Sequence, residues 1–233
     1  MQERGEEMTH REEDCLDNLI KRRRSVDLKD SELSRRYLTY KGKEIDSVTM
    51  SMTMIRKIKM RLIDSLVPGS SGWSLVYSTD VHGYALSTLM ANAQQGPSNG
   101  CYVLVCLEDG ASESEYERVF GAVFTTRMVY KTAPFGTPST ALFVFKTPRD
   151  QNPSGSFNTM LNVYSADGDE KGFYIMAKKS YIAFGCSHGR FGLLLNQTML
   201  QGQSHPVDTF KNERLSLKDK FGVRHLELWH VLL

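Results

Sequence analysis

The chain has 233 residues, of which 40% are hydrophobic, and its 29 basic and 27 acidic side chains leave a formal net charge of +2. This length predicts one domain with an appendage, and so small a net charge provides no global field favouring nucleic acid or a membrane surface, so no nucleic-acid partner is expected. No apolar run reaches the length of a membrane span or a secretory signal, which predicts an intracellular, cytoplasmic protein without a transmembrane segment.

Residues 1–48 differ in composition from the rest of the chain. The first 18 residues hold seven acidic side chains against two basic ones, whereas residues 19–43 hold nine basic against three acidic. Segregated charge with few large apolar groups predicts a disordered tail, and this places the folded domain at 49–233. The basic run Lys21–Arg24 leaves two interpretations open, a solvated arm and a nuclear signal or acidic-surface contact. The acidic first residues count against mitochondrial import. Association with mitochondria or with the nucleus is therefore possible, but the sequence has no clear targeting signal for either.

A helical pattern follows the tail. Ile55, Ile58 and Leu62 recur at intervals of three and four, which predicts an amphipathic helix over 52–66. Its basic side chains suit an anionic membrane, but a sheet fold needs helices to cover its faces, so packing of the apolar stripe into the core is the preferred interpretation.

Strand patterns fill most of the remainder. After a strand at 72–78, a second helix is predicted over 86–94 with Ser87 as its cap. Short aromatic and branched runs separated by turn residues follow at 101–107, 119–124, 141–145, 160–164, 173–177 and 223–232. Many short strands with two helices predict an α+β, mainly β fold, in which two antiparallel sheets pack as a β-sandwich with flanking helices.

The stretch 181–195 predicts a buried β-hairpin, because two short apolar runs flank a loop marked by Gly185 and Gly189. Glycine suits a loop whose backbone takes positive φ. A phosphate-binding loop is disfavoured, since no Lys-Ser or Lys-Thr pair follows and the next segment is strand-like. No cofactor is therefore predicted.

Cys186 is the candidate redox residue, because Arg190 and His188 beside it could lower the pKa of its thiol; an inert cysteine at a strand end is the alternative. The four cysteines of the chain form no Cys-x-x-Cys pair, so free thiols are expected. A zinc site needs three or four ligands, and the histidines show no ligand spacing, so no metal is expected. Ser204 and His205 are adjacent rather than parts of a triad, and no catalytic residue is predicted.

Glu227 and Trp229 are candidate interaction or structural residues in the last strand. Strand alternation places them on one face and Leu226 and Leu228 on the other. The sequence leaves open whether Glu227 is buried with a partner or exposed in a binding surface. Gly83, in a turn, is a further candidate structural position. The aromatic residues expected in the core are Trp73, Phe184, Phe191 and Trp229.

A series of motifs resembles one known domain in the right order. They are WSLVYSTDVHGYALSTL at 73–89, FGAVF at 120–124, IAFG at 182–185, FGLLL at 191–195, GQS at 202–204, TFKN at 209–212 and LELW at 226–229. Together they resemble the TLDc domain of the oxidation-resistance proteins, from about residue 52 to the C-terminus. The resemblance implies a β-sandwich with flanking helices, protection against oxidative damage and, as in several family members, binding of the vacuolar proton-pumping ATPase and regulation of its assembly.

The sequence departs from the family pattern at three places. Cys186–His188 interrupts a glycine run, Asn196 replaces an acidic residue, and Pro138-Ser139 stands where Gly-Glu is common. The lost acidic positions weaken an acid-base or metal mechanism more than a binding role. Two function classes stay open: a non-catalytic, monomeric adaptor that binds pump subunits, which is the preferred prediction, and a thiol-based redox enzyme acting through Cys186.

Overall fold

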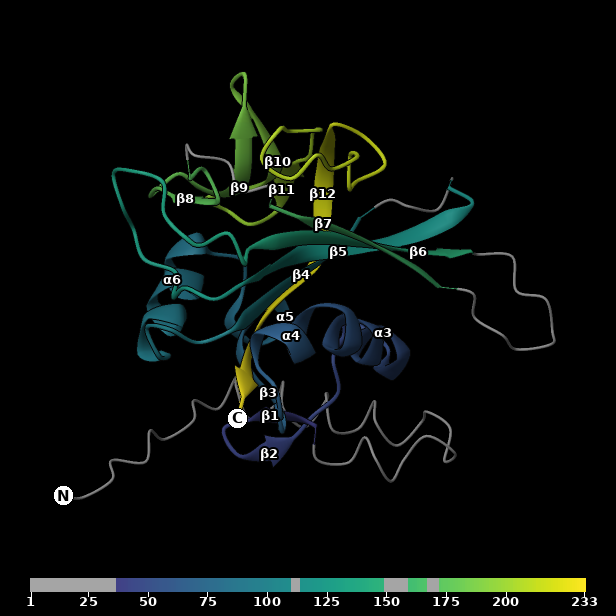
Figure 1. Cartoon of the computed structure of the whole chain (residues 1–233), viewed down its shortest axis with the longest axis vertical. Helices are drawn as coiled ribbons and strands as arrows, with labels where there is room; N and C mark the ends of the chain where they lie inside the picture. The colour runs from purple at the N-terminus through teal and green to yellow at the C-terminus, as the bar shows by residue number, and fades with distance from the viewer. Residues whose placement is uncertain (1–36, 110–113, 149–158, 167–171) are drawn as a thin grey trace.

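The computed structural model describes residues 37–109, 114–148, 159–166 and 172–233 (Figure 1). Of the tail predicted to be disordered, residues 1–48, the first 36 lie outside these ranges. Within the described ranges, no helix has the length and apolar character needed to cross a membrane.

The described part of the chain is mainly β. Its strands are β1 (Leu38–Tyr40), β2 (Lys43–Glu44), β3 (Gly72–Ser78), β4 (Tyr102–Glu108), β5 (Tyr116–Phe124), β6 (Ala141–Pro148), β7 (Met160–Ser165), β8 (Ile175–Ala177), β9 (Tyr181–Ser187), β10 (Arg190–Asn196), β11 (Gln201–Gln203) and β12 (Lys220–Leu232). Its helices are α3 (Met52–Ile58), the π-helix η1 (Lys59–Ile63), α4 (Asp64–Leu66), α5 (Thr79–His82) and α6 (Leu86–Gln95).

The strands form one sheet in the order β7-β6-β5-β4-β12-β11-β10-β9-β8, with β3 and β1 joined to the side of β12 and β2 joined to β1. All neighbours are antiparallel except β1 and β3. Strand β12 pairs with β11 near its start and with β3 and β4 further along, so the sheet folds over at β12 into two layers (Figure 1). The predicted mainly β, antiparallel sandwich class is confirmed, with the two layers continuous through one strand.

A first core fills the space between the two layers. It combines one face of β4, β5 and β12 with inward residues of the β9–β10 hairpin. Phe124 of β5 and Phe184 of β9 meet here, with ring centroids 5.4 Å apart. Residues Leu226 and Leu228 of β12 belong to this core. Side chains from segments about 60 residues apart in sequence therefore share one dry interior. The burial of this apolar surface is the dominant contribution to the stability of such folds.

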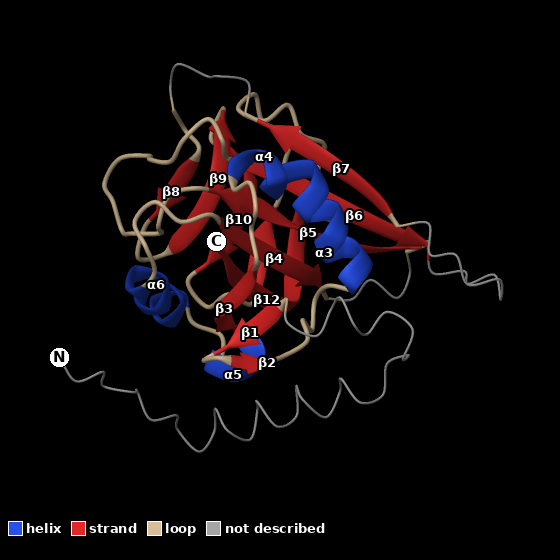
Figure 2. Cartoon of the chain, turned by 60° about the horizontal axis from the view of Figure 1, so that its bottom comes forward, coloured by secondary structure: helices blue, strands red, loops and turns tan. Residues whose placement is uncertain are grey.

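A second core lies on the other face of β3, β4 and β12. The helical segment α3-η1-α4 crosses that face (Figure 2) and contributes Ile55, Ile58 and Ile63, each at most 1% exposed. Trp73 and Trp229 belong to the same core. The amphipathic helix expected over 52–66 therefore exists, and its apolar stripe covers a sheet face as predicted.

The helical segment changes from an α-helix to a π-helix at Lys59, where the spacing of its buried residues also changes. Ser51 caps its start by accepting a hydrogen bond from the Met54 N–H. Ile58 and Ile63 are both fully buried although they stand five residues apart, a spacing that the wider π-turn places on one face and an α-helix does not. Core packing therefore explains why η1 interrupts the α-helix.

The second predicted helix is also present, as α6, with Leu86, Leu89 and Met90 buried. Ser87 does not cap it, however. The N-cap is Ala85, which makes no side-chain bond, and the Leu86 N–H instead donates to the Gln197 carbonyl at 3.0 Å. A tertiary contact here replaces the local cap that the sequence predicted.

The structure extends the folded part beyond the predicted boundary at residue 49. Strand β1 pairs in parallel with β3, Leu38 beside Trp73, and both Leu38 and Tyr40 are buried in the second core. The sequence did not predict β1, β2 or β11, because each is at most three residues long and too short for a periodic pattern.

Three of the four aromatic residues expected in the core are completely buried: Trp73, Phe184 and Trp229 are each 0% exposed. The prediction for Phe191 was wrong. Its side chain is only partly buried, outside both cores, and its ring packs on Tyr181 with centroids 5.7 Å apart. Phe191 lies beside the hairpin turn, past the region that the facing layer covers.

A chain that ends at Lys220 should fail to fold, because it loses the strand that pairs with β3, β4 and β11. The matched chain that lacks residues 1–36 keeps every described contact and should give an unchanged circular dichroism spectrum. A cut at residue 45 should not be harmless, since it removes β1 and β2. A soluble, cooperatively unfolding chain ending at Lys220 would contradict this.

Substitution of Phe184 by alanine should lower the free energy of unfolding by about 3–5 kcal/mol, the usual loss for a buried ring. Phe191→Ala should cost clearly less, because its ring keeps contact with solvent. Urea unfolding of both variants measures the difference. Equal losses would mean that Phe191 is packed as tightly as Phe184.

Candidate functional site

The candidate residues from the sequence gather in two places. Gly83, Glu227 and Trp229 lie where α5 meets β12, next to the N-terminal segment 47–49. Gly185, Cys186 and Gly189 lie in the β9–β10 hairpin. The two groups belong to different layers of the sandwich (Figure 1).

Glu227 is a buried carboxylate, 2% exposed, on the face of β12 that it shares with Trp229. Its Oε1 accepts a hydrogen bond from the Val48 N–H at 2.7 Å. Its Oε2 accepts from the Ser47 and Thr49 hydroxyls, each at 2.5 Å, and from the Trp229 indole N–H at 3.1 Å. The alternation predicted for this strand is therefore correct, and the partner of the charge is a neutral segment far away in sequence.

Burial raises the pKa of the Glu227 carboxyl above its ordinary value, and the hydrogen bonds from Ser47, Thr49, Val48 and Trp229 oppose the rise. With four donors on its two oxygens, the carboxylate has little capacity left for a substrate. Its contacts suit a structural tie between the last strand and residues 47–49.

The motif at 78–84 forms a tight corner against β12. Ser78 is the cross-strand partner of Glu227, and its hydroxyl accepts from the Asp80 N–H to cap α5. The Thr79 hydroxyl accepts from the Leu226 N–H at 3.1 Å. Gly83 ends the helix with φ +75° and ψ −179°, a conformation almost restricted to glycine, and its carbonyl accepts from the Tyr77 hydroxyl at 2.5 Å.

His82 completes the corner. Its Nδ1 accepts from the Ser78 N–H at 3.0 Å, which places the proton of the neutral ring on Nε2, 3.2 Å from the Tyr40 hydroxyl. The ring stacks on Tyr77 at 5.5 Å between centroids. In the same corner, His225 Nδ1 of β12 lies 2.8 Å from the Asp80 carboxylate of α5. Each described polar group of the corner thus holds a neighbouring element in place.

Cys186 is partly buried, and the surroundings of its thiol do not activate it. Burial raises the pKa of the Cys186 thiol, and a hydrogen bond from the Gly189 backbone only opposes the rise. Its backbone N–H donates to the Thr209 hydroxyl at 3.2 Å, and that hydroxyl donates to the Cys186 carbonyl at 3.3 Å. The predicted lowering by neighbouring cations is not what the structure supports.

The hairpin glycines both adopt positive φ, +67° at Gly185 and +72° at Gly189. At Gly185 a Cβ atom would also lie 2.6 Å from the Phe210 ring, so a side chain there would displace the loop that packs on the hairpin. At Gly189 no atom lies within 4 Å of that position, so only the backbone conformation favours glycine.

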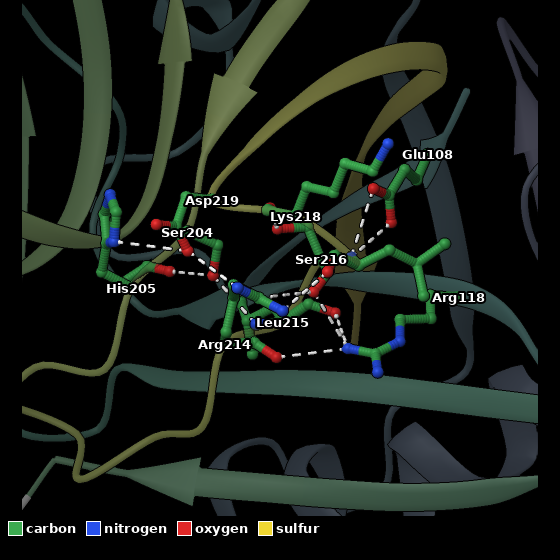
Figure 3. A network of polar contacts seen from close by, with 11 residues as sticks. Glu108, Arg118, Ser204, His205, Arg214, Leu215, Ser216, Lys218 and Asp219 are labelled. Atoms are coloured by element: carbon green, nitrogen blue, oxygen red, sulfur yellow. Dashed lines mark hydrogen bonds and ion pairs between the residues drawn. The ribbon is translucent and has the colours of Figure 1, made fainter. Parts of the chain in front are cut away.

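A third polar centre was not predicted as a site. It fixes the loop 204–219 through contacts with Arg118 of β5 and Glu108 of β4 (Figure 3). The Arg118 guanidinium donates to three successive carbonyls, those of Arg214, Leu215 and Ser216, at 3.3, 3.1 and 3.0 Å. Glu108, which is 5% exposed, accepts the Leu217 N–H on both oxygens, at 3.2 and 3.0 Å. One arginine and one glutamate from neighbouring strands thus satisfy the backbone of this loop.

Two buried side chains inside the loop complete its fixation. The Ser204 hydroxyl donates to the Gly192 carbonyl at 2.7 Å and accepts from the Leu215 N–H at 2.9 Å. The Asn212 amide donates to the His205 carbonyl at 2.9 Å. Both residues lie in the GQS and TFKN motifs that were noted only as a resemblance. Neighbours in sequence gave no signal, because Ser204 stands between Gln203 and His205 and Asn212 between Lys211 and Glu213.

No group of three or more His, Cys, Asp or Glu side chains in the described ranges could hold a metal ion. Cys101, immediately before β4, and Cys106 on β4 are buried, and burial raises the pKa of the Cys101 thiol to about 12. The buried polar side chains reported above bind backbone or one another.

Comparison with known proteins gives these motifs a family. The model of the TLDc domain matches residues 44–232. The chain belongs to the TLDc domain family. Human Oxidation resistance protein 1 is 30% identical over 171 residues and the Xenopus laevis protein of that name 32%, in both cases over 72% of this chain. Human Nuclear receptor coactivator 7 is 31% identical over 157 residues, 67% of this chain. The chain spans only 17%, 18% and 14% of these three relatives.

The TLDc match begins at residue 44, and the segment at 47–49 is the one that binds Glu227. The tie between the first and last parts of the domain therefore lies wholly within the matched range. The TLDc motifs at 73–89, 202–204 and 209–212 correspond to the α5 corner and the fixed loop, so this part of the resemblance lies on residues that position loops.

Glu227→Ala should lower the free energy of unfolding by about 3 kcal/mol or more, because it leaves buried donors without an acceptor. Glu227→Gln should also destabilise the TLDc fold, since its amide group must face at least one of those donors. Urea unfolding at pH 7 measures both. A loss below about 1 kcal/mol in the alanine variant would show that the tie contributes little.

The pH dependence has a definite sign. With its folded pKa raised above 4.5, the protonated Glu227 is favoured in the folded state, so its contribution is fully present below pH 4.5 and is lost as pH rises through the folded pKa. The stability of the wild type minus that of Glu227→Gln should therefore fall with rising pH above 4.5. A difference that grows with pH would contradict this.

Cys186 should react slowly with iodoacetamide at pH 7, because a raised pKa lowers its thiolate fraction below that of a free cysteine. The rate, followed by peptide mass spectrometry, should keep rising as pH passes the ordinary value of 9.0. Cys101 in the same native protein is the buried control. Faster alkylation of Cys186 than of a cysteine in a short peptide would indicate an activated thiol.

Proposed function

We propose that the protein acts in resistance to oxidative stress as a non-catalytic adaptor, whose TLDc domain binds the vacuolar proton-pumping ATPase and regulates its assembly. In this proposal the domain works in the cytoplasm, as a monomer, on the peripheral sector of the pump. No cofactor or metal takes part.

One observation carries the non-catalytic part of the proposal. The buried polar side chains of the family motifs, above all Glu227, form hydrogen bonds with the backbone and with neighbouring elements. A reaction centre needs groups that face a substrate and have free capacity to bind it. An assembly of saturated polar ties suits the other task, which is to hold surface loops in one shape for docking.

The comparisons support the physiological part. The relatives with the name Oxidation resistance protein 1 share this domain, and the chain spans only a small part of each. Pump binding rests on the family resemblance. An adaptor role is consistent with a domain that recurs inside much longer proteins, because a binding module needs no further residues for chemistry.

Cys186 supports a second candidate, a thiol-based peroxide reductase. Among the described cysteines it alone is not buried. Its thiolate would attack one peroxide oxygen, breaking the O–O bond to give a sulfenic acid and hydroxide, and a cellular thiol would then reduce the sulfenic acid. The raised pKa of the thiol opposes this route, so the adaptor is favoured.

Cells that lack the protein, complemented with wild type or Cys186→Ser, separate the two candidates. An adaptor should restore peroxide survival equally with either form, because serine keeps the backbone contacts with Thr209. Glu227→Ala, which should destabilise the domain and lower its level in cells, is the negative control. Loss of protection in a folded Cys186→Ser protein would favour the enzyme.

Affinity purification of the tagged full chain from the same cells tests the partner. Pump subunits should be recovered with wild type and Cys186→Ser, and lost with Glu227→Ala. Recovery of no pump subunit with the wild type, in cells that it protects, would contradict the pump as partner and leave the role in oxidative stress standing.

A further inference from the structure

The helical segment α3-η1-α4 presents a charged outer surface that core packing does not explain. Between residues 52 and 66 it carries four basic side chains against one acidic one, Asp64. Arg56 and Arg61 are exposed, and Met60 between them is 74% exposed. The buried stripe of this segment accounts for its apolar residues on the inner side only.

The π-turn shapes this surface. Ile58, Leu62 and Ile63 reach the core, whereas Met60 and Arg61 lie at the outer side of η1. Single π-turns are rare and frequently occur at functional positions. The turn therefore joins a packing requirement on one side of the helix to an exposed methionine and arginine on the other.

A second exposed methionine extends the surface onto the sheet. The Lys57 ammonium donates to the Thr159 carbonyl, which ties α3 to the start of β7, and the next residue, Met160, is 46% exposed. Figure 2 shows α3 alongside β6 and β7. Arginine and methionine are the residue types enriched at protein interfaces, and methionine adapts its shape to a partner.

We propose that the basic face, formed by Arg56, Lys57, Met60, Arg61 and Met160, is a docking site for an acidic segment of a protein partner. The proposal rests on the adaptor function and names the surface that serves it. The excess of cations selects an anionic partner by charge complementarity, and the two exposed methionines supply apolar contact.

A membrane is the other anionic candidate, and the packing disfavours it. An interfacial helix binds lipid by inserting its whole apolar face. Here that face is in the protein core, with Ile55 at 1% exposure and Ile58 at 0%, which leaves only the methionines to insert. The basic face therefore fits a protein surface better than a bilayer.

Charge reversal on the full chain tests the surface. The double variant Met60→Asp/Arg61→Glu should bind the isolated peripheral sector of the pump about tenfold or more weakly, because like charges then face each other. Arg61→Lys, which keeps the charge, should bind like wild type within about twofold. Raising the salt concentration should weaken wild-type binding and have little effect on the double variant.

The matched control is Leu200→Asp/Lys179→Glu, which makes the same kind of change at two exposed positions of the other layer. It should leave binding unchanged. Thermal unfolding verifies that both double variants fold. Equal binding by the Met60→Asp/Arg61→Glu variant and wild type would overturn the proposal. So would an effect of that variant confined to binding of phosphatidylserine vesicles.

A photo-crosslink separates this proposal from the choice of partner. Full-length protein with p-benzoylphenylalanine at position 60, irradiated in cells, should link to peptides rich in Asp and Glu, and the same group at position 179 should not. If wild type does not bind the pump but position 60 links to acidic peptides of another protein, the pump assignment fails and the basic face stands. Links to non-acidic peptides, or none, would overturn the basic face.

Discussion

Strand β12 pairs with β3, β4 and β11, so this one strand belongs to both layers of the sandwich. Its inner side chains, such as Leu226 and Leu228, enter the first core, while Trp229 enters the second. A single strand near the end of the chain therefore completes two hydrophobic interiors. Such long-range pairing makes folding cooperative, because neither layer buries its apolar face until the strand is in place.

Glu227 adds a polar constraint at the same strand. A carboxylate in a dry interior is tolerated only when its oxygens are satisfied, and here the donors come from Ser47, Val48, Thr49 and Trp229. The tie therefore couples the first described segment to the last strand. The Glu108 and Arg118 contacts do the same for the loop 204–219, whose backbone would otherwise be buried without partners. Both ties restrict loop shape rather than open a path for a substrate.

These ties lie inside the domain, so a partner must bind to its outer surfaces. The helical segment over the second core is held by its isoleucines on one side, so the exposed side is presented rigidly. The β9–β10 hairpin is held by Phe210 and Thr209, and its cysteine is part of that framework. A scaffold whose loops are held by such ties suits a binding module, because little conformational entropy is lost when a partner docks.

The sequence by itself determined the elements whose residues repeat with a regular period. The helix over 52–66, the strand at 72–78, the hairpin at 181–195 and the shared face of Glu227 and Trp229 all follow from alternation, spacing and turn residues, which act locally. The motifs in chain order were enough to indicate the family.

Tertiary structure alone decided the features that depend on residues far apart. Leu38 and Tyr40 lie in a charged, short segment whose burial arises only because β3 is there to pair with it. Phe191 has the pattern of a core residue, yet the facing layer does not cover its place on the hairpin. Three of the four donors of Glu227 stand 178 to 180 residues before it. At Cys186, burial raises the pKa of the thiol although Arg190 and His188 are its neighbours in sequence. Periodicity reports which face a residue occupies, whereas only the packed chain decides what covers that face and which polar groups meet there.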